Sequence, residues 1–344
     1  MESSPHVCAA LALLALCAAP LSSCERPSRL GDGGAATDSG VPDAGPGPGR
    51  HGDDGGSIYL EVGTWNLEFF GDPTAGPADD DLQLANVRGV IADAGADFWG
   101  VEEVVDDARF QAMVSGLPGR AGIVADDAVV PQGSIFYSAT DQKPAFVYDT
   151  TKITVLSAQL ILTDPTYQYD LAWRPPLRLD LRISKQGAAE DLVVIVLHLK
   201  AYATYDDWLR RRNSAEDLKA YLDQNLAAQK VLVLGDWNDD LDVSTAKDGG
   251  SYLPSPFLGF LGDPAYAFLT RELAFANVGT TVRYSSTIDH QLATDDLAAD
   301  WIAGSTEVVR PDLWPVPVAG YGTTTSDHYP VLARFDLLAP DGGS

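Results

Sequence analysis

The chain has 344 residues, of which 45% are hydrophobic and 21% are charged, a composition typical of a globular protein with a sizeable buried core. Its 49 Asp and Glu residues outnumber its 23 Lys and Arg residues, and the net charge of −26 excludes a protein that coats nucleic acid through many phosphate contacts. The cysteines are Cys8, Cys17 and Cys24, so neither a disulfide framework nor a cysteine-rich zinc site is expected in the rest of the chain.

The N-terminal segment has the pattern of an export signal. Val7–Leu21 is an apolar run of about 15 residues, which is short for a membrane span and typical of a signal peptide. It runs into Leu21-Ser22-Ser23-Cys24, which resembles a bacterial lipobox and implies that residues 1–23 are removed and Cys24 is lipidated. An ordinary cleaved secretory signal and a retained cytoplasmic segment are the alternatives. No Lys or Arg precedes the run, which departs from the positive start of most signal peptides. We expect an exported protein, lipid-anchored to the bacterial cell envelope or surface, or secreted.

Two further segments are expected to be disordered. Residues 25–56 are dominated by Gly, Pro, Asp and Ser and contain no aromatic residue, so they cannot bury enough apolar surface to offset the entropy lost on ordering. The tail, residues 338–344, is expected to behave in the same way. Between them, residues 57–337 contain no internal repeat and no second linker, which predicts one folded domain.

Hydrophobic patterns within this domain predict alternating strands and helices. The predicted strands are Ile58–Thr64, Asp97–Val101, Pro144–Tyr148, Ile153–Leu156, Leu177–Ile183, Leu192–Leu197, Val231–Leu234, Thr287–Leu292 and Val331–Phe335. The predicted helices are Asp80–Ala94, Ala108–Leu117 and Asp206–Leu226. A continuously apolar strand such as Leu192–Leu197 is typical of a sheet covered on both faces. We therefore expect two sheets packed face to face, with helices outside.

Polar side chains lie at the ends of six of these strands, where they can converge on one pocket that the sheets hold rigid. The segments are Thr64-Trp65-Asn66-Leu67-Glu68, Gly100-Val101-Glu102-Glu103-Val104, His198-Leu199-Lys200, Gly235-Asp236-Trp237-Asn238-Asp239, Ile288-Asp289-His290 and Ser326-Asp327-His328-Tyr329-Pro330. Taken one at a time, each has an ordinary interpretation as a turn, a helix cap, a surface acid or a core histidine.

Taken in order, the six segments resemble the signature of the endonuclease/exonuclease/phosphatase superfamily, whose best-known member is deoxyribonuclease I. The resemblance covers essentially all of residues 57–337. It implies an α/β fold, a four-layer α/β/β/α sandwich of the deoxyribonuclease I-like type. It also implies that residues 57–337 form a catalytic domain that hydrolyses a phosphate ester with the help of a divalent metal.

The resemblance implies a metal site of oxygen ligands. Glu103 is the first expected ligand, with Glu102 standing where the family has Gln. Asn66 is expected to hold that ligand or to contact metal or phosphate, and Asp327 to bind this metal or a second one. Mg²⁺ or Mn²⁺ is the expected ion, because Mg²⁺ prefers carboxylate and water oxygens, and Ca²⁺ is an alternative.

The same resemblance implies five catalytic residues: His198, Asp236, Asn238, Asp289 and His328. Asp236 would accept a proton from the attacking water, and Asn238 would donate to the phosphoryl oxygens. These two residues face the same side if the strand stays extended beyond Asp236. Asp289 would fix the tautomer of His328, and His198 would be a general acid or a phosphate contact. The sequence leaves open which histidine protonates the leaving oxygen.

Further residues around these motifs allow two interpretations each. Arg174, in Trp173-Arg174-Pro175-Pro176, resembles a phosphate contact of the family, with a surface arginine as the alternative. Gln142 stands where related proteins carry a Glu that orients a catalytic histidine. His290 is expected to point away from the site and to be structural. Residues 210–212, three arginines, are expected on a solvated helix face, with a substrate-phosphate patch as the alternative.

Three function classes fit these motifs. The first is a Mg²⁺-dependent phosphodiesterase, a sequence-nonspecific nuclease (endonuclease) that acts on extracellular DNA or RNA as a monomer and touches the membrane only through its lipid anchor. The second is a phosphatase or phosphodiesterase on lipid or small-molecule phosphate esters, sphingomyelinase-like or inositol-phosphatase-like. An exposed apolar hairpin would favour it, and Tyr252–Leu261 is the candidate, although a packed loop is the main interpretation. The third is a non-catalytic binding lipoprotein, against which the intact set of polar residues argues.

Overall fold

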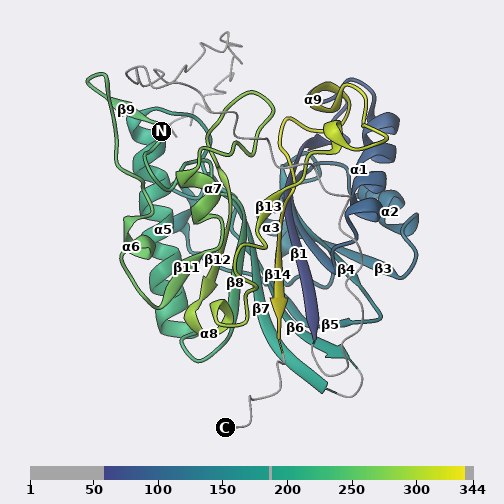
Figure 1. Cartoon of the computed structure of the whole chain (residues 1–344), viewed down its shortest axis with the longest axis horizontal. Coiled ribbons are helices and arrows are strands. Elements are labelled where there is room, and N and C mark those ends of the chain that lie inside the picture. Colours follow the sequence, from purple (N-terminus) through teal and green to yellow (C-terminus); the bar gives the residue numbers. More distant parts are fainter. Residues whose placement is uncertain (1–57, 186–187, 338–344) are drawn as a thin grey trace, which may run out of the picture. The chain divides into compact units, whose positions relative to one another are not determined.

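Two six-stranded sheets pack face to face and carry helices on their outer faces (Figure 1). The computed structural model describes residues 58–185 and 188–337. The predicted signal segment, the lipidation site at Cys24, the linker 25–56 and the tail 338–344 therefore lie outside the described residues. None of the helices in the described part combines the length and apolar character that crossing a membrane requires. The arrangement confirms the predicted α/β sandwich.

The first sheet has the strand order β13-β14-β1-β2-β4-β3. Its strands are β1 (Tyr59–Phe70), β2 (Phe98–Val104), β3 (Arg120–Val124), β4 (Lys143–Asp149), β13 (Glu307–Val308) and β14 (Val331–Asp336). Strands β1 and β2 are parallel, whereas β14 runs antiparallel to β1. The carboxyl ends of β1 and β2 and the start of β14 consequently lie at one edge of the sheet.

The second sheet repeats this arrangement, with the order β11-β12-β8-β7-β6-β5. Its strands are β5 (Ile153–Leu160), β6 (Leu177–Lys185), β7 (Ala188–His198), β8 (Val231–Asp236), β11 (Tyr266–Phe268) and β12 (Asp289–Thr294). Strands β7 and β8 are parallel, and β12 is antiparallel to β8. A separate two-stranded pair is formed by β9 (Lys247–Asp248) and β10 (Ser251–Tyr252).

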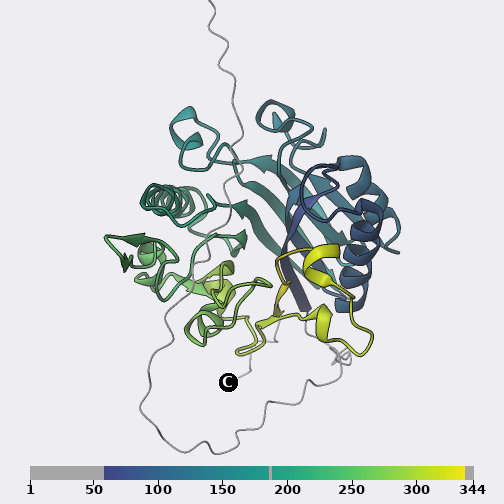
Figure 2. The ribbon, with the colours of Figure 1, turned by 90° about the horizontal axis from the view of Figure 1, so that it is seen from above.

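Helices α1 (Asp80–Ala94) and α2 (Asp107–Ser115) cover the outer face of the first sheet, and α5 (Tyr205–Asn225) covers the second (Figures 1 and 2). Helix α1 begins where the Asp79 carboxylate accepts hydrogen bonds from the backbone N–H groups of residues 81 and 82. The shorter helices are α3 (Gly133–Phe136), α4 (Pro165–Gln168), α6 (Leu258–Leu261), α7 (Arg271–Phe275), α8 (Asp295–Ala298), the 3₁₀ turn Pro311–Leu313 and α9 (Tyr321–Thr324).

The side chains of β7 explain why its sequence is continuously apolar. Val194 and Val196 point into the core between the two sheets, whereas Val193, Ile195 and Leu197 point into the core beneath α5. Strand β6, by contrast, buries alternate residues only, as its alternating pattern predicts. The two sheets approach closely at Gly100, where an added Cβ would lie 1.9 Å from Leu234 Cδ1. This close packing lets residues of both sheets meet at the same edge.

Candidate active site

The strand directions bring the predicted site residues together. Register pairs Asp236 at the end of β8 with His198 at the end of β7 and with Asp289 at the start of β12. In the other sheet, Asn66 on β1 is paired with Glu102 on β2, directly before Glu103. The segment leading into β14 carries Asp327 and His328. Because parallel strands end, and antiparallel strands begin, at the same edge, all of these side chains lie at one rim of the sandwich.

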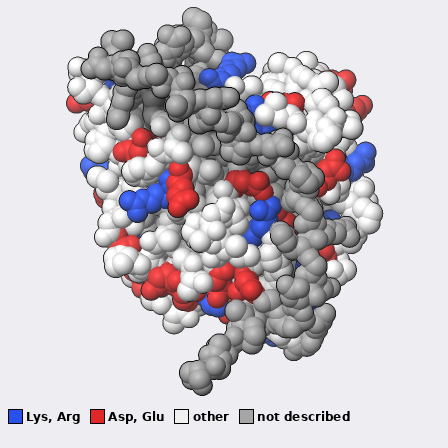
Figure 3. All heavy atoms as spheres, viewed as in Figure 1, with Lys and Arg blue, Asp and Glu red and all other residues white. Residues whose placement is uncertain are grey.

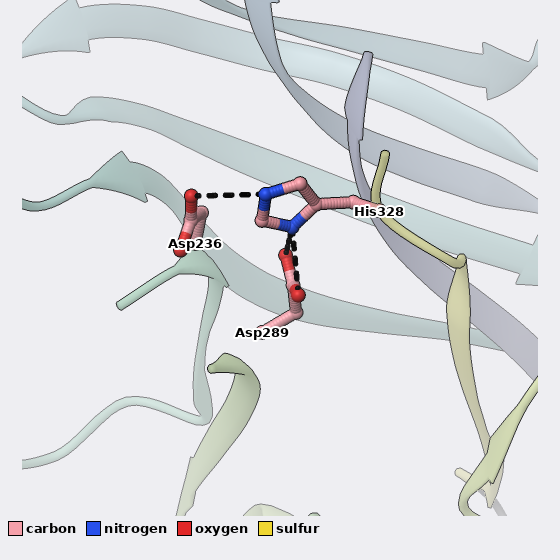
Figure 4. Close-up of side chains that lie close together, drawn as sticks. All are labelled: Asp236, Asp289 and His328. Atoms are coloured by element: carbon pink, nitrogen blue, oxygen red, sulfur yellow. Dashed lines mark hydrogen bonds and ion pairs between the residues drawn. The ribbon is translucent and has the colours of Figure 1, made fainter. Parts of the chain in front are cut away.

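A buried histidine between two carboxylates lies at the centre of this rim (Figure 4). His328 Nδ1 lies 3.0 Å and 2.9 Å from the two carboxylate oxygens of Asp289. Its other nitrogen, Nε2, lies 3.9 Å from Asp236 Oδ2. The peptide oxygen of His328 accepts hydrogen bonds from Trp65 Nε1 and from the Tyr321 hydroxyl, which fix the backbone under the ring. The imidazole is thus held through Nδ1 and its backbone, while Nε2 faces Asp236.

Burial and charge separate the protonation states of the two histidines at the rim. Burial alone would lower the pKa of His328, but Asp289 and Asp236 outweigh it and raise that pKa well above its ordinary value. Burial, together with the Arg174 guanidinium, lowers the pKa of His198 well below its ordinary value. At neutral pH His328 is therefore a cation with an N–H donor on each ring nitrogen, whereas His198 is neutral.

Asn66 links the carboxylates of the two sheets. Its Nδ2 donates to Glu103 Oε1 and to Asp236 Oδ2, each at 3.0 Å. The second oxygen of Glu103 accepts from the Phe69 backbone N–H at 3.0 Å. Glu103 itself has a φ of 63°, at an irregularity in the pairing of β1 with β2, which turns its carboxylate into the rim. Asn66 therefore positions Glu103 and Asp236 as a pair.

Glu68 is a residue at the rim that sequence reasoning missed. Burial, with the nearby charges of Asp327 and Glu103, raises its pKa to about 7. Among the described residues, its Oε2 is buried without a hydrogen-bond partner. Its position two residues after Asn66, in the first polar segment, was the available signal.

The donor set at the rim fits a hard divalent cation. Glu103, Asp236, Asp289, Asp327 and Glu68 bring carboxylate oxygens to one region, and Mg²⁺ or Mn²⁺ prefers such ligands. Burial, with Asp289 and Glu103 nearby, raises the pKa of Asp236 to about 7, although His328 opposes the shift. The side-chain atoms of Asp236, Asp289 and His328 also lie within 4.8 Å of one another. The protonated ring of His328 has no free lone pair, so the carboxylate oxygens would be the ligands. An excess of buried negative charge is what a bound cation would neutralise.

His198 and Arg174 form the second half of the rim. His198 Nε2 lies 3.5 Å from Asp236 Oδ2 and 3.7 Å from Glu103 Oε1. Arg174 Nη1 lies 3.0 Å from Nδ1 and 3.2 Å from Nε2 of that histidine. The same guanidinium donates to Gln142 Oε1 and to the Leu199 carbonyl, each at 2.9 Å. Arg174 is therefore at the site and not a surface arginine, and Gln142 orients Arg174.

The structure corrects one expectation about Asn238. Strand β8 ends at Asp236, and Asn238 has a φ of 57° in the following turn, so the two side chains are not on one face of an extended strand. The turn closes because the Asn238 backbone N–H donates to Asp236 Oδ1 at 2.9 Å. Its side-chain Nδ2 donates to the Leu199 carbonyl at 3.1 Å. Asn238 thus stays beside His198 and Asp236, but it reaches them through a turn.

The expectation of a solvated arginine face at residues 210–212 is wrong for two of the three. Arg211 is fully buried and pairs with Asp239, whose Oδ2 accepts from Nε at 3.0 Å and Nη2 at 2.8 Å. Its Nη1 donates to the carbonyls of Lys200 and Tyr202 at 2.8 and 2.6 Å. Arg210 is also buried and donates to the Tyr169 carbonyl. The reason is that Arg211 packs against the loops that follow β7 and β8, and Arg210 against the segment between β5 and β6 that contains Tyr169.

His290 is structural, as its strand position predicts. It is fully buried, its Nε2 donates to the Asp239 carbonyl at 2.9 Å, and its Nδ1 accepts from the Thr270 hydroxyl at 2.8 Å. Both ring nitrogens of the neutral form are therefore satisfied, and burial lowers the pKa to about 3.

This histidine predicts a pH-dependent contribution to stability. Its pKa is about 3 in the fold but about 6.5 in the unfolded chain, so below pH 6.5 only the unfolded chain takes up this proton. Between pH 7.5 and pH 5, the free energy of unfolding of the wild type should therefore fall by about 2 kcal/mol more than that of His290→Gln. Urea unfolding of both proteins at the two pH values measures the difference, and equal losses would contradict the assignment.

Comparisons with known proteins agree with this geometry. A sequence profile described as the Endonuclease/Exonuclease/phosphatase family matches residues 63–328. A search of curated proteins found no significant match. Among solved structures, humanized D. rerio TDP2 is similar at 12% identity and a TM-score of 0.54, covering 81% of this chain and 99% of that one. An endonuclease/exonuclease/phosphatase from Bacteroides vulgatus is similar at 16% identity and a TM-score of 0.55, and the match covers 81% of this chain and 99% of that one. An AP endonuclease from Archaeoglobus fulgidus is similar at 16% identity and a TM-score of 0.54, and the match covers 81% of this chain and 100% of that one.

Proposed function

Because this chain belongs to the endonuclease/exonuclease/phosphatase family, whose members are hydrolytic phosphoesterases, we propose that it hydrolyses the phosphodiester bonds of nucleic acid with the help of a divalent cation. The observation that carries the proposal is the buried rim where the Asp289–His328 pair faces Asp236. The proposed enzyme is a sequence-nonspecific endonuclease. The fold is shared with an AP endonuclease and with a D. rerio TDP2 that was solved with a single strand DNA product, which supports this substrate class.

The proton transfers of the proposed reaction fall to the central residues. Asp236, with a pKa of about 7, is suited to accept the proton of the attacking water near neutral pH. His328 is protonated, and its Nε2 can donate to a phosphoryl or leaving oxygen as negative charge develops there. Asp289 holds the opposite nitrogen and stabilises the imidazolium. Base and donor thus carry complementary protonation states at the same pH.

The second half of the rim would bind the phosphate. The Arg174 guanidinium and the neutral His198 ring lie beside Asp236, where they can contact phosphoryl oxygens that the water attacks. Gln142 and the Leu199 carbonyl hold Arg174, and Asn238 shares that carbonyl. The phosphate would therefore lie between this half and His328, which orients it for attack.

Glu103 and Asp327 would hold the divalent cation, with Asn66 orienting Glu103 through its hydrogen bond. When bound, Mg²⁺ or Mn²⁺, or Ca²⁺ as the alternative, would neutralise charge on the phosphoryl group. This local positive charge matters for a protein of net charge −26, which repels polyanions at long range. On the face shown in Figure 3, Lys and Arg side chains lie among Asp and Glu side chains.

Export belongs to the same proposal. Removal of residues 1–23 and lipidation of Cys24 would place the enzyme at the bacterial cell envelope or surface, where extracellular DNA or RNA is the available polymer. Metabolic labelling with a fatty-acid analogue tests this part, with Cys24→Ala as the matched control. If the fatty-acid label remained on the Cys24→Ala protein, Cys24 would not be the site of lipidation.

The proposed activity predicts cation-dependent degradation of a plasmid. The purified protein should degrade plasmid DNA with Mg²⁺ or Mn²⁺, lose this activity in EDTA, and regain it when excess cation is returned. Protein carrying Asp236→Asn, purified in parallel, controls for a contaminating nuclease. Sphingomyelin and an inositol phosphate complete the panel. Hydrolysis of either, with plasmid and RNA untouched, would replace the nuclease by a lipid or small-molecule phosphoesterase, and no hydrolysis at all would favour a binding protein.

The segment whose exposure would have favoured a lipid substrate is packed, as the main interpretation of its sequence predicts. Within Tyr252–Leu261, the Phe257 and Phe260 side chains are buried, and both pack against the Trp237 ring. Leu258 is the large apolar side chain of this segment that is exposed, with 57% of its surface accessible to solvent. The segment is therefore a packed loop and not an apolar hairpin aimed at a membrane.

A further inference from the structure

Four exposed aromatic side chains lie on two loops and at the start of α5, next to the phosphate half of the rim. Tyr169 is 50% exposed and Trp173 61% exposed, on the loop that ends at Arg174. Tyr202 is 70% exposed on the loop that follows His198, and Tyr205, the first residue of α5 after that loop, is 50% exposed. We call these four residues the aromatic shelf. Large aromatic surfaces left open beside a site typically mark a binding surface, because burying them elsewhere in the fold would be favourable.

Direct contacts join the first loop of the aromatic shelf to helix α5 and to the second loop. The Tyr169 hydroxyl donates to Asp206 Oδ2 at 2.9 Å, and the Arg210 guanidinium lies 4.2 Å from the centroid of the same ring. Trp173 meets the Tyr169 ring edge to face at 6.0 Å. Arg174, which directly follows Trp173, donates to the Leu199 carbonyl of the other loop. The shelf is therefore continuous with the guanidinium that would bind the phosphate.

The backbone of the shelf is held in a conformation that presents these rings to solvent. Trp173 has a φ of 57° and Tyr202 a φ of 78°, the left-handed region that bulky residues rarely adopt. The Trp173 N–H donates to the Gln168 carbonyl at 2.7 Å, and the buried Arg211 donates to the Tyr202 carbonyl at 2.6 Å. Strained conformations that buried groups enforce are characteristic of binding and catalytic sites.

We propose that the aromatic shelf stacks the unpaired bases of a single nucleic-acid strand whose phosphate lies at Arg174. This inference rests on the proposed function and names its substrate form. Every base has a flat aromatic face, so stacking is tolerant of sequence, and it gains affinity without the basic stripe that a chain of net charge −26 lacks. The Lys200 ammonium, 4.4 Å from the centroid of the Tyr202 ring, supplies a cation beside the stack. Bases in a duplex are already stacked, so unpaired strands are favoured.

A binding experiment separates bases from backbone charge. We expect the protein in EDTA, which prevents hydrolysis, to bind a labelled oligothymidylate more tightly than an abasic oligomer of the same length and charge. Trp173→Ala and Tyr202→Ala should each weaken oligothymidylate binding about tenfold and leave binding of the abasic oligomer unchanged. Trp173→Phe and Tyr202→Phe should keep most of the affinity. Phe275→Ala, an aromatic residue on α7 that is 54% exposed outside the shelf, is the matched control.

Kinetics with Mg²⁺ separate stacking from a disturbed active site. The alanine variants should raise KM for the oligothymidylate about tenfold with kcat unchanged, and cleavage of the abasic oligomer should not change. Equal effects on both oligomers would overturn the proposal, since they would show displacement of Arg174. Loss of binding to sphingomyelin vesicles, with oligothymidylate binding intact, would instead assign the shelf to a lipid surface. Base-dependent binding without hydrolysis would support stacking on the aromatic shelf and overturn the proposed nuclease activity. Hydrolysis without base-dependent binding would support the nuclease activity and overturn stacking on the shelf.

Discussion

Replacing His328 with alanine is expected to lower kcat/KM for a phosphodiester by about 10³-fold. The substitution removes the group that stays protonated between Asp236 and Asp289 and that can donate to the developing oxyanion. Asp289→Asn should lose a similar amount, because a neutral amide can no longer hold the imidazolium. The double variant should be scarcely worse than either single one, since the two residues act as a unit. Steady-state kinetics on one plasmid or oligonucleotide substrate gives all three values.

Two controls make this result specific. Circular dichroism and urea unfolding of each variant show whether the fold survives, since His328 is buried. His290→Gln changes another buried histidine, next to Asp289 in sequence but bonded to Thr270 and the Asp239 carbonyl, and it should stay within a few-fold of wild type. A loss below tenfold for a folded His328→Ala protein would show that this imidazole takes no part in the reaction.

Arg211→Met is expected to lower the free energy of unfolding by about 3–5 kcal/mol. The substitution leaves the Asp239 carboxylate buried without its cation, and it also removes the donor to the carbonyls of Lys200 and Tyr202. Arg212→Met is the matched control on the same helix, because that side chain is 41% exposed and pairs with Glu216 at the surface. It should cost about 0.5 kcal/mol or less.

A double substitution tests the cause of this loss. Adding Asp239→Asn to Arg211→Met removes the unpaired charge and should recover part of the lost stability. Urea denaturation of the three variants and the wild type gives the comparison. If Arg211→Met were as stable as Arg212→Met, the buried pair would contribute little, and the positions of Lys200 and Tyr202 would have to be fixed by other contacts.

The hydrophobic pattern was sufficient to predict the long elements of the fold. Helix α1 has the predicted bounds, because an acidic N-terminal turn and Gly95 mark its ends in the sequence itself. Strand β1 extends past the predicted Thr64 to Phe70, since its polar residues are buried at the rim as well. Strand β3 and the two-residue β13 were missed, because they are edge strands whose pairing depends on distant partners.

The site was predictable where it depends on strand ends and not where it depends on tertiary contacts. The convergence of Asp289 and His328 was expected from their positions at strand ends, and their pairing was implied by the family resemblance. The left-handed turn at Asn238 is a local feature, in which the backbone N–H donates to the Asp236 carboxylate two residues earlier. The burial of Arg211 depends on Asp239, 28 residues away, and this partner cannot be recognised from the local sequence, because Arg210, Arg211 and Arg212 look alike there.

The central imidazole comes from one sheet and its two acids come from the other. This division has a consequence for how the protein would lose activity. His328 precedes β14, whereas Asp236 and Asp289 lie on β8 and β12, so among the described strands no hydrogen-bonded ladder connects the ring to its acids. The contacts across the layers include an isolated bridge between Thr281 and His328 and a hydrogen bond from Gln291 Nε2 to the β14 backbone. A slide of one layer over the other that broke these contacts would part the ring from its acids and leave the strand ladders within each sheet intact. Activity would then depend on the relative position of the two sheets. Under mild denaturant, activity should be lost before the circular dichroism signal of the β-strands.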